Sequence, residues 1–327
     1  MFLGLKSLRA ARLSLLLTAV ATAGFVVTDM ARGESTKGTM QNPAQVALGP
    51  SLASPGDARA DARRVPAAWL GRSGQLRAVI DTPESLRRVV AREIADVPEM
   101  IATPGLHDLG MVTPQGDPFY VVSLLPYGAK KGSSLRGYHV GSWPKNAPKN
   151  APAARYAPPA GFIEVTQENA ATPVSSHFKL EDFLTHDQDG IWPKFLVLKP
   201  RLLDKLELIS TALAQRGLPS RLHVMSGFRT PQYNEQGVGE KGGRASKSRH
   251  MYGDAADVFV DEDGNGAMDD LNGDGRVTVA DARVLFNVAE SVEAAHPDLA
   301  GGLSPYNANS AHGPFVHVDA RGTKARW

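Results

Sequence analysis

The sequence predicts an α+β protein with a small N-terminal α+β region at residues 69–145 and a larger domain at residues 162–327. Two patterns indicate this class: the first part combines one helical repeat with short strand-like runs, and the second combines an amphipathic helix with short buried strands. Residues 146–161 between them are rich in Pro, Asn and Ala, which is typical of a linker or of a belt laid along the next domain.

Residues 1–23 have the features of a secretory signal peptide. Three basic side chains precede an apolar run at 13–27, and Ala21-Thr22-Ala23 is a small-x-small cleavage site. The run is shorter than the roughly 20 residues that span a bilayer comfortably. We therefore expect cleavage, with a retained anchor as the alternative, and in either case export to the periplasm or cell envelope.

Residues 24–68 are predicted to be a disordered spacer, because small residues, Pro and scattered charge dominate and aromatic residues are nearly absent. Folded structure is expected from about Trp69. Asp81-Thr82-Pro83-Glu84 is typical of a helix start with Asp81 as the N-cap. Short strand-like runs follow at 119–125 and 138–143, and this region shows no recognisable chemistry.

The larger domain is expected to begin with a short strand at 162–165. A helix from Pro200 to Gln215 follows, because its apolar residues recur on one stripe and Gly217 provides a stop. Strands are expected at three later runs: 222–224, 255–260 and 315–319. Since alternate residues of a strand face opposite ways, His317 and Asp319 should share a face.

Composition limits the class of protein and of site. A chain of 327 residues with 42% hydrophobic content can build a substantial core. The net charge of +2 is too balanced for a nucleic-acid-binding surface. The chain has 0 Cys, so any transition-metal site must use His and carboxylate ligands.

His250, Asp257 and His317 are the strongest candidates for such a site. Gly253 and Ala255, which lie between His250 and Asp257, allow close backbone approach, and Asp257 lies on an otherwise apolar strand. A carboxylate on a buried strand must be paired or metal-bound, because burying it bare is costly. Two His and one carboxylate suit Zn²⁺ with a fourth position open for water, as in catalytic zinc sites. A structural ion pair is the alternative.

Four motifs occur in order over residues 162–327: Ser-Gly-Phe-Arg-Thr-Pro with Tyr233-Asn234, Ser-x-His-x-x-Gly-x-Ala-x-Asp, Phe-Val-His-Val-Asp, and the closing Ala325-Arg326-Trp327. With these motifs the region resembles the zinc D-Ala-D-Ala carboxypeptidases and murein endopeptidases of the M15 type. The resemblance implies a small antiparallel sheet flanked by helices, zinc bound by His250, Asp257 and His317, substrate contact by Arg229, and action at the cell wall.

The chain departs from several members of that family at the general base. They place Glu three residues before the last His ligand, where this chain has Pro314. The candidates that remain are His312, which some members carry at this spacing, and Asp319. Instead of acting as the base, His312 could be a surface-loop residue without a catalytic role. Asp319 could instead be a partner that holds a ligand His in one tautomer.

Arg229 and Ser248 are predicted to bind substrate. Arg229 follows Gly227-Phe228 on a strand-to-helix turn, from which its guanidinium can grip a peptide carboxylate or stabilise a tetrahedral oxyanion. The alternative for Arg229 is a salt bridge that pins the loop, because Arg is also the common choice for structural ion pairs.

The insert at 261–281 matches a calcium-binding loop of the EF-hand type, and its Asp ending resembles the repeats of dockerins. The predicted ligands of one calcium ion are Asp270, Asn272, Asp274, Arg276 and Asp281. A second calcium is predicted at Asp261, Asp263, Asn265 and Asp269. These ions would have a structural role, and an acidic surface turn is the alternative.

The combined hypothesis is an exported, monomeric zinc metallopeptidase that hydrolyses amide bonds in peptidoglycan stem peptides or cross-links. The D,D- or L,D-specificity and the carboxypeptidase or endopeptidase mode stay open. One rival is a non-catalytic, metal-stabilised module that binds the cell wall, supported by the missing Glu at position 314. Another is a calcium-dependent adhesion or scaffold protein built around the insert.

Overall fold

The computed structural model describes residues 62–94, 99–240 and 242–327. The predicted signal peptide and most of the predicted spacer lie outside the described residues. Within this described part, no helix combines the length and the apolar character needed to cross a bilayer.

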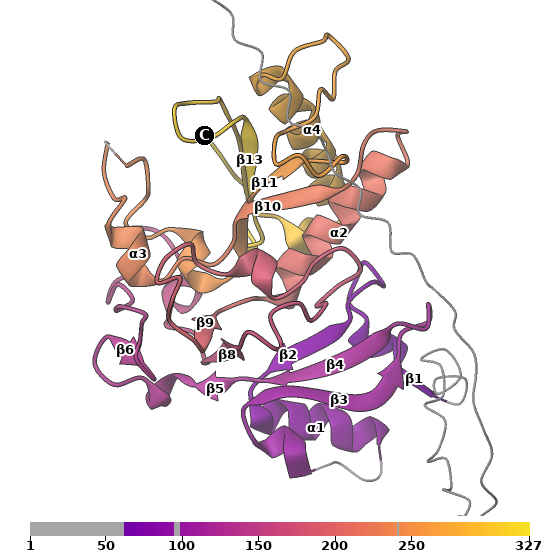
Figure 1. The fold of residues 1–327 in the computed structure, drawn as a ribbon, viewed down its shortest axis with the longest axis vertical. Coiled ribbons are helices and arrows are strands. Elements are labelled where there is room, and N and C mark those ends of the chain that lie inside the picture. The colour runs from indigo at the N-terminus through magenta and orange to yellow at the C-terminus, as the bar shows by residue number, and fades with distance from the viewer. Residues whose placement is uncertain (1–61, 95–98, 241) are drawn as a thin grey trace, which may run out of the picture. The chain divides into compact units, whose positions relative to one another are not determined.

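Most strands of the described chain follow one another in runs, and the α-helices lie between these runs (Figure 1). The α-helices are α1 (Pro83–Glu93), α2 (Pro200–Ala214), α3 (Pro231–Glu235) and α4 (Val279–Ala295). The strands are β1 (Arg63–Arg64), β2 (Ala78–Asp81), β3 (Gly105–Val112), β4 (Pro118–Ser123), β5 (Leu125–Pro126), β6 (Ser134–Leu135), β7 (Tyr138–His139), β8 (Gly161–Val165), β9 (Lys194–Leu196), β10 (Leu222–Ser226), β11 (Ala255–Val260), β12 (Gly302–Tyr306), β13 (Phe315–Asp319) and β14 (Ala325–Arg326).

The N-terminal region is a four-stranded sheet in the order β1-β3-β4-β2, with α1 against one face (Figure 1). Leu86 and Val90 of α1 are buried in its core. The N-cap of α1 is Thr82, whose hydroxyl accepts the Ser85 N–H at 3.4 Å, and not Asp81 as predicted. Asp81 ends β2, and its carboxylate accepts the Thr82 N–H instead, at 2.7 Å.

Ordered structure begins before Trp69, the residue at which the sequence suggested it. Strand β1 pairs in parallel with β3, and the N–H of Val65 donates to Val112 O at 2.9 Å. Val65 is buried in the core of this region together with Trp69. This apolar anchoring holds a segment whose composition alone resembles a spacer.

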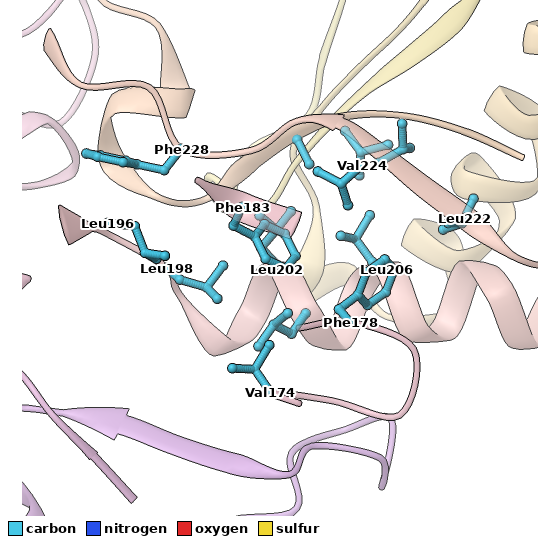
Figure 2. Close-up of a cluster of buried hydrophobic side chains, with 14 of the residues drawn as sticks. Val174, Phe178, Phe183, Leu196, Leu198, Leu202, Leu206, Leu222, Val224 and Phe228 are labelled. Carbon is cyan, nitrogen blue, oxygen red and sulfur yellow. The ribbon is translucent and has the colours of Figure 1, made fainter. Parts of the chain in front are cut away.

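The N-terminal region and the larger domain share a sheet and a core. Strands β5, β8 and β9 form one three-stranded sheet, in which Leu125 pairs with Phe162. One cluster of buried side chains includes Ile80 and Val122 as well as the apolar stripe of α2; part of this cluster is shown in Figure 2. Burial of this shared apolar surface gives the two regions a common source of stability.

The segment 146–161 lies along the turn that carries His250. Lys247 Nζ donates to Ala147 O at 3.0 Å, and Arg249 Nη1 donates to Arg155 O at 2.6 Å. Just before the segment, the Trp143 indole N–H donates to Met251 O at 2.8 Å. Of the two forms expected for this segment, a linker or a belt, the contacts are those of a belt.

The larger domain is built on a five-stranded sheet in the order β10-β11-β13-β12-β14. All neighbouring strands are antiparallel except β12 and β14, which run parallel. Helices α2 and α4 pack against each other, and α4 also contacts β12 and β13. The predicted α+β class, with a small antiparallel sheet flanked by helices, is therefore confirmed.

A buried ion pair ties the helices to the end of β13. Lys205 on α2 is fully buried, and its ammonium donates to Glu293 on α4 and to the main-chain oxygen of Asp319 at 2.6 Å. Glu293 also accepts the Gly301 N–H at 2.8 Å. Buried charges persist only when their partners are in place. This pair therefore fixes Asp319 relative to both helices.

Candidate metal centre

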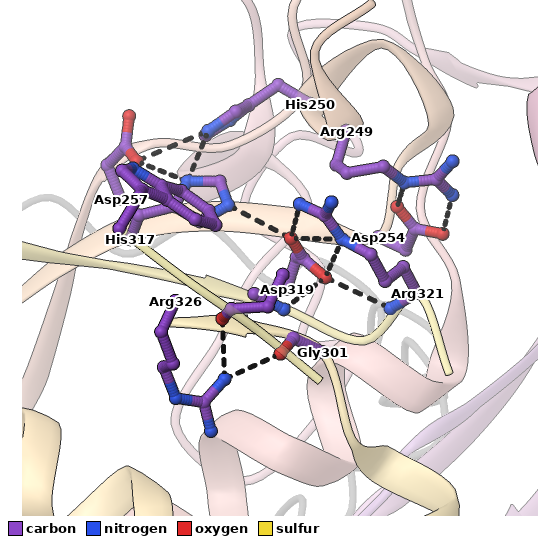
Figure 3. A network of polar contacts seen from close by, with 12 residues as sticks. Arg249, His250, Asp254, Asp257, Gly301, His317, Asp319, Arg321 and Arg326 are labelled. Atoms are coloured by element: carbon purple, nitrogen blue, oxygen red, sulfur yellow. Dashed lines mark hydrogen bonds and ion pairs between the residues drawn. The ribbon is translucent and has the colours of Figure 1, made fainter. Parts of the chain in front are cut away.

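Three side chains from separate elements converge at one point of the sheet (Figure 3). His250 lies on a single 3₁₀ turn, Arg249–Tyr252, while Asp257 lies on β11 and His317 on β13. His250 Nε2 is 3.2 Å from His317 Nδ1 and 3.2 Å from Asp257 Oδ1. His317 Nδ1 is 3.0 Å from the same Asp257 oxygen. All three residues are buried.

The backbone places these groups with little freedom. Asp257 and His317 are directly opposite each other in the antiparallel register of β11 and β13, so their side chains stand on one face. Gly253 ends the turn of His250 in the left-handed region, at φ 68°. A Cβ at Gly253 would lie 2.3 Å from Val197 O, so only glycine allows this approach.

Each imidazole uses its outer nitrogen to donate a hydrogen bond. His250 Nδ1 lies 2.7 Å from Gly227 O, which can only accept, so Nδ1 carries the hydrogen. His317 Nε2 lies 3.1 Å from Asp319 Oδ2, a carboxylate oxygen that accepts in the same way. Outer hydrogen bonds of this kind set the tautomer of metal-ligating histidines.

The three inner atoms then all carry lone pairs and no hydrogen when both rings are neutral. Acceptors at 3.0–3.2 Å repel one another unless a cation lies between them. Zinc bonds of about 2.0–2.2 Å correspond to tetrahedron edges of roughly 3.3–3.6 Å, somewhat longer than the observed separations. The donor set and its spacing therefore fit a zinc ion with an open fourth position.

Burial and charge shift the pKa values in this site. Burial raises the pKa of Asp257, but the two imidazoles and Arg229 outweigh this effect and hold it well below its usual range. Burial lowers the pKa of His250. Burial also acts to lower the pKa of His317, but the carboxylates of Asp257 and Asp319 outweigh it and raise the value. Asp257 is thus a carboxylate at neutral pH.

Arg229 contacts the metal centre rather than open solvent. Its Nη2 donates to Asp257 Oδ2, and its Nε donates to Ser226 Oγ at 2.9 Å. The side chain of Arg229 is only 14% exposed. Arg229 therefore holds the second oxygen of Asp257 while Oδ1 faces the imidazoles, which is the salt bridge that the sequence left as its alternative role.

Asp319 lies behind His317, on the side away from the three inner atoms. Its Oδ1 accepts the Gly302 N–H at 2.8 Å, and both of its oxygens accept from Arg321 Nε at 2.9 Å. Burial raises its pKa, but His317 and Arg321 outweigh this and hold the pKa well below the usual range. These contacts match a partner that orients a ligand His.

His312 and Ser248 do not hydrogen-bond to the three central residues within the described chain. His312 is half-buried on the loop between β12 and β13, where its Nδ1 donates to Gly313 O at 2.8 Å and its Nε2 accepts from Asn309 Nδ2 at 2.8 Å. Ser248 is buried immediately before the turn of His250, and its main-chain oxygen accepts the Met251 N–H at 3.3 Å. Their predicted roles stay predictions.

The acidic insert separates into two groups of side chains. Carboxylate oxygens of Asp261, Asp263 and Asp269 lie within 4.8 Å of one another, close enough to share a metal ion. Asp270, Asp274 and Asp281 are not grouped in this way in the described chain. Their carboxylates accept main-chain N–H groups instead, with Asp270 accepting those of residues 273 to 275.

Asp281, predicted at loop position 12, has a structural role at the start of α4. Its Oδ2 accepts the Thr278 N–H at 2.8 Å, and this bond completes a capping box with the Thr278 hydroxyl. Its Oδ1 accepts the Leu271 N–H at 2.9 Å. The loop around Asn272 and Arg276 is therefore closed by hydrogen bonds, and its calcium binding stays a prediction.

Two residues at the centre were not assigned a role from the sequence. Gly227 supplies the carbonyl that orients His250, and Trp327 places its ring centroid 5.2 Å from that of His317. Both belong to motifs that the sequence shows, Ser-Gly-Phe-Arg-Thr-Pro and Ala-Arg-Trp. The motifs therefore indicated these positions, but the contacts that explain them cross between distant parts of the chain.

Comparison with known families supports the sequence motifs. Residues 182–267 match the family model Peptidase_M15_2, described as peptidoglycan L,D-endopeptidase MepK. The matched stretch includes Arg229, His250 and Asp257 and ends before His317. The resemblance to M15-type peptidases is thus confirmed by an independent comparison. None of the curated proteins matches the chain.

Proposed function

We propose, from the M15-type match over residues 182–267, that this protein is a zinc-dependent peptidase that hydrolyses amide bonds in peptidoglycan peptides. The observation that carries the proposal is the close approach of three inner atoms of His250, Asp257 and His317, which all present lone pairs to one another when both rings are neutral. Two members of this set, His250 and Asp257, lie within the stretch that matches the family.

The residues around the centre have separable tasks. Zinc, when bound, supplies Lewis acidity that lowers the pKa of water towards about 7 and polarises a scissile carbonyl. Gly227 O and Asp319 keep the hydrogens of the two imidazoles on their outer nitrogens, so the inner nitrogens remain ligands. Arg229 keeps one oxygen of Asp257 turned towards those nitrogens. The chain thus provides a preorganised set of ligand atoms for the cation.

The substrate we propose is the peptide part of peptidoglycan, cut as an L,D-endopeptidase. This choice follows the description of the matching family, whereas the sequence left D,D-cleavage and carboxypeptidase action open. Export to the cell envelope, predicted from residues 1–23, is part of the proposal because the substrate lies there. The cut is expected at a bond between an L- and a D-configured centre.

The test is digestion of purified muropeptides by the zinc-loaded protein, followed by mass spectrometry of the products. We expect cleavage that a chelator abolishes and added zinc restores. The His250→Ala variant should cleave nothing, because the metal loses one of its ligands. If the zinc-loaded protein leaves every muropeptide intact, the peptidase proposal is wrong.

The second candidate is a non-catalytic module that uses the same centre to bind the cell wall. It is favoured by the hydrogen bonds of Asp319 and His312, which engage both candidate bases with other groups of the chain. A binding module would bind insoluble peptidoglycan in a zinc-dependent way without releasing peptides from it. Sedimentation with peptidoglycan sacculi, run beside the digestion, separates the two candidates.

We also propose that the insert 261–281 binds calcium, on the strength of its loop pattern and the grouped carboxylates of Asp261, Asp263 and Asp269. Calcium at about 100 times its Kd should raise the free energy of unfolding by about 2.7 kcal/mol and Tm by about 5 °C. Melting curves in EGTA and in calcium measure this shift. Asp261→Asn should abolish it if calcium binds at Asp261, Asp263 and Asp269, and Asp274→Asn should abolish it if calcium binds in the loop 270–281. An unchanged Tm contradicts calcium binding.

A further inference from the structure

An exposed aromatic ring lies directly beside the buried metal centre. Trp327 is 57% exposed, although it is among the largest apolar side chains of the protein. Its ring centroid is 5.2 Å from that of His317, with an interplanar angle of 51°. More than half of the Trp327 surface thus remains accessible although its ring lies next to His317. The exposure of Trp327 therefore indicates a surface available for contact.

The indole of Trp327 is exposed but held in place. Its Nε1–H donates to the Tyr306 hydroxyl at 2.5 Å, and its main-chain oxygen accepts from Ser304 Oγ at 2.5 Å. A Cβ at Gly302 would lie 2.9 Å from Trp327 Cη2, so glycine there leaves room for the ring. A group that is already ordered loses little conformational entropy when it binds a ligand.

The Trp327 ring begins a row of aromatic side chains along one side of the centre. Tyr306, which accepts its hydrogen bond, stacks on Phe315 with ring centroids 4.7 Å apart. His312 meets the same Phe315 edge-on at 4.8 Å. The row thus links the ring beside His317 to the loop that carries His312.

The charge near the ring is neutralised, so its surface is apolar. The Arg321 guanidinium lies 5.8 Å from the Trp327 ring centroid, but it is paired with the buried Asp319. A flat, uncharged, rigid surface of this kind favours apolar side chains and the C–H faces of a peptide over carboxylates. Tryptophan in such a position is a frequent source of binding energy.

We propose that Trp327 is a specificity-determining residue whose exposed face binds the peptide segment next to the scissile bond, through an apolar side chain such as the methyl group of alanine. The proposal rests on the peptidase function proposed above. It assigns to Trp327 a role in holding substrate and none in holding the metal, since the indole offers no lone pair as a ligand.

The test compares Trp327→Ala and Trp327→Phe with the wild type in the zinc-loaded, full-length protein. A disaccharide-peptide released from peptidoglycan by a muramidase serves as substrate. For Trp327→Ala we expect KM to rise about tenfold and kcat to stay within about threefold, because truncation removes a substrate contact. Trp327→Phe should recover most of the loss. Met100→Ala, at an exposed apolar residue outside the larger domain, is the matched control.

Zinc affinity and fluorescence distinguish this role from others. Both Trp327 variants should bind zinc as tightly as the wild type, and a drop in zinc affinity that accounts for the loss of activity would show that the ring only covers His317. Titration with the same muropeptide should change the indole emission of the wild type, and Trp327→Phe should lose that change. An unchanged KM in Trp327→Ala, or an emission change that persists in Trp327→Phe, would overturn the proposal.

Failure of the peptidase proposal would be seen separately. If the wild type cleaves no muropeptide, the proposed reaction is wrong, while the fluorescence titration still decides whether Trp327 contacts the peptide. If the wild type cleaves normally and Trp327→Ala has an unchanged KM, the specificity role of Trp327 is wrong and the peptidase proposal stands.

Discussion

Replacing Asp257 with Asn is expected to abolish zinc binding and peptide cleavage together. The amide keeps the shape of the carboxylate but removes its charge, so two neutral imidazoles face a neutral group. Cleavage should fall on the order of 10³-fold or more, because several kcal/mol of transition-state stabilisation depend on the metal. Zinc content by elemental analysis and muropeptide cleavage are measured on the same preparation.

The controls separate metal loss from misfolding. Asp189→Asn removes an exposed carboxylate from a loop and should leave zinc content and cleavage unchanged. Asp257→Asn also leaves Arg229 without its partner, so the double variant with Arg229→Gln removes the unpaired charge. Melting curves of all three variants report the fold. An Asp257→Asn protein that retains one zinc and normal cleavage contradicts the assignment of this ligand.

Replacing Asp319 with Asn should weaken zinc binding by about 10–100-fold, the usual effect of losing a partner that orients a ligand His. The amide has one acceptor in place of two, and His317, Gly302 and Arg321 all donate to this side chain. Cleavage at saturating zinc should stay within about tenfold of the wild type. A competition titration with a chromophoric chelator measures the affinity.

The same variant decides between the two open roles of Asp319. If Asp319 were the general base, kcat at saturating zinc would fall by about 10²–10⁴-fold, whatever the change in affinity. His312→Gln is the comparison variant, since it removes the other candidate base and leaves the partner of His317 in place. A large loss of kcat in His312→Gln with normal zinc binding would assign the base to His312.

Local patterns in the sequence were sufficient for part of the centre. Alternation along Phe315–Asp319 predicted that His317 and Asp319 share a face, and their side chains do meet, at 3.1 Å. The apolar surroundings of Asp257 indicated that its carboxylate must be paired. Both inferences need only strand periodicity and the cost of burying charge.

Contacts between distant parts of the chain could not be predicted in this way. The register that sets Asp257 opposite His317 depends on the packing of β11 against β13, and no local pattern determines it. The salt bridge of Arg229 with Asp257 depends on the same packing. Asp281 shows a further limit of reading function from sequence. The last ligand of a calcium loop and a carboxylate that caps the following helix would stand at the same position at the start of α4, so the sequence does not distinguish them.

The N-terminal boundary was misjudged for a related reason. The composition of the residues before Trp69 predicted a spacer. In the structure, Val65 is buried and β1 pairs with β3, which is distant in the sequence. A two-residue strand has no periodicity to detect. Its pairing partner, and not its own sequence, makes it part of the sheet.

The most direct test of the central claim is a crystal structure of the zinc-loaded protein with anomalous diffraction measured at the zinc absorption edge. We predict one strong anomalous peak at bonding distance from His250 Nε2, Asp257 Oδ1 and His317 Nδ1. The outer nitrogens of the two imidazoles should keep their hydrogen bonds to Gly227 and Asp319. A zinc-loaded crystal with no peak among these three atoms, or with its peak only in the acidic insert, would contradict the claim.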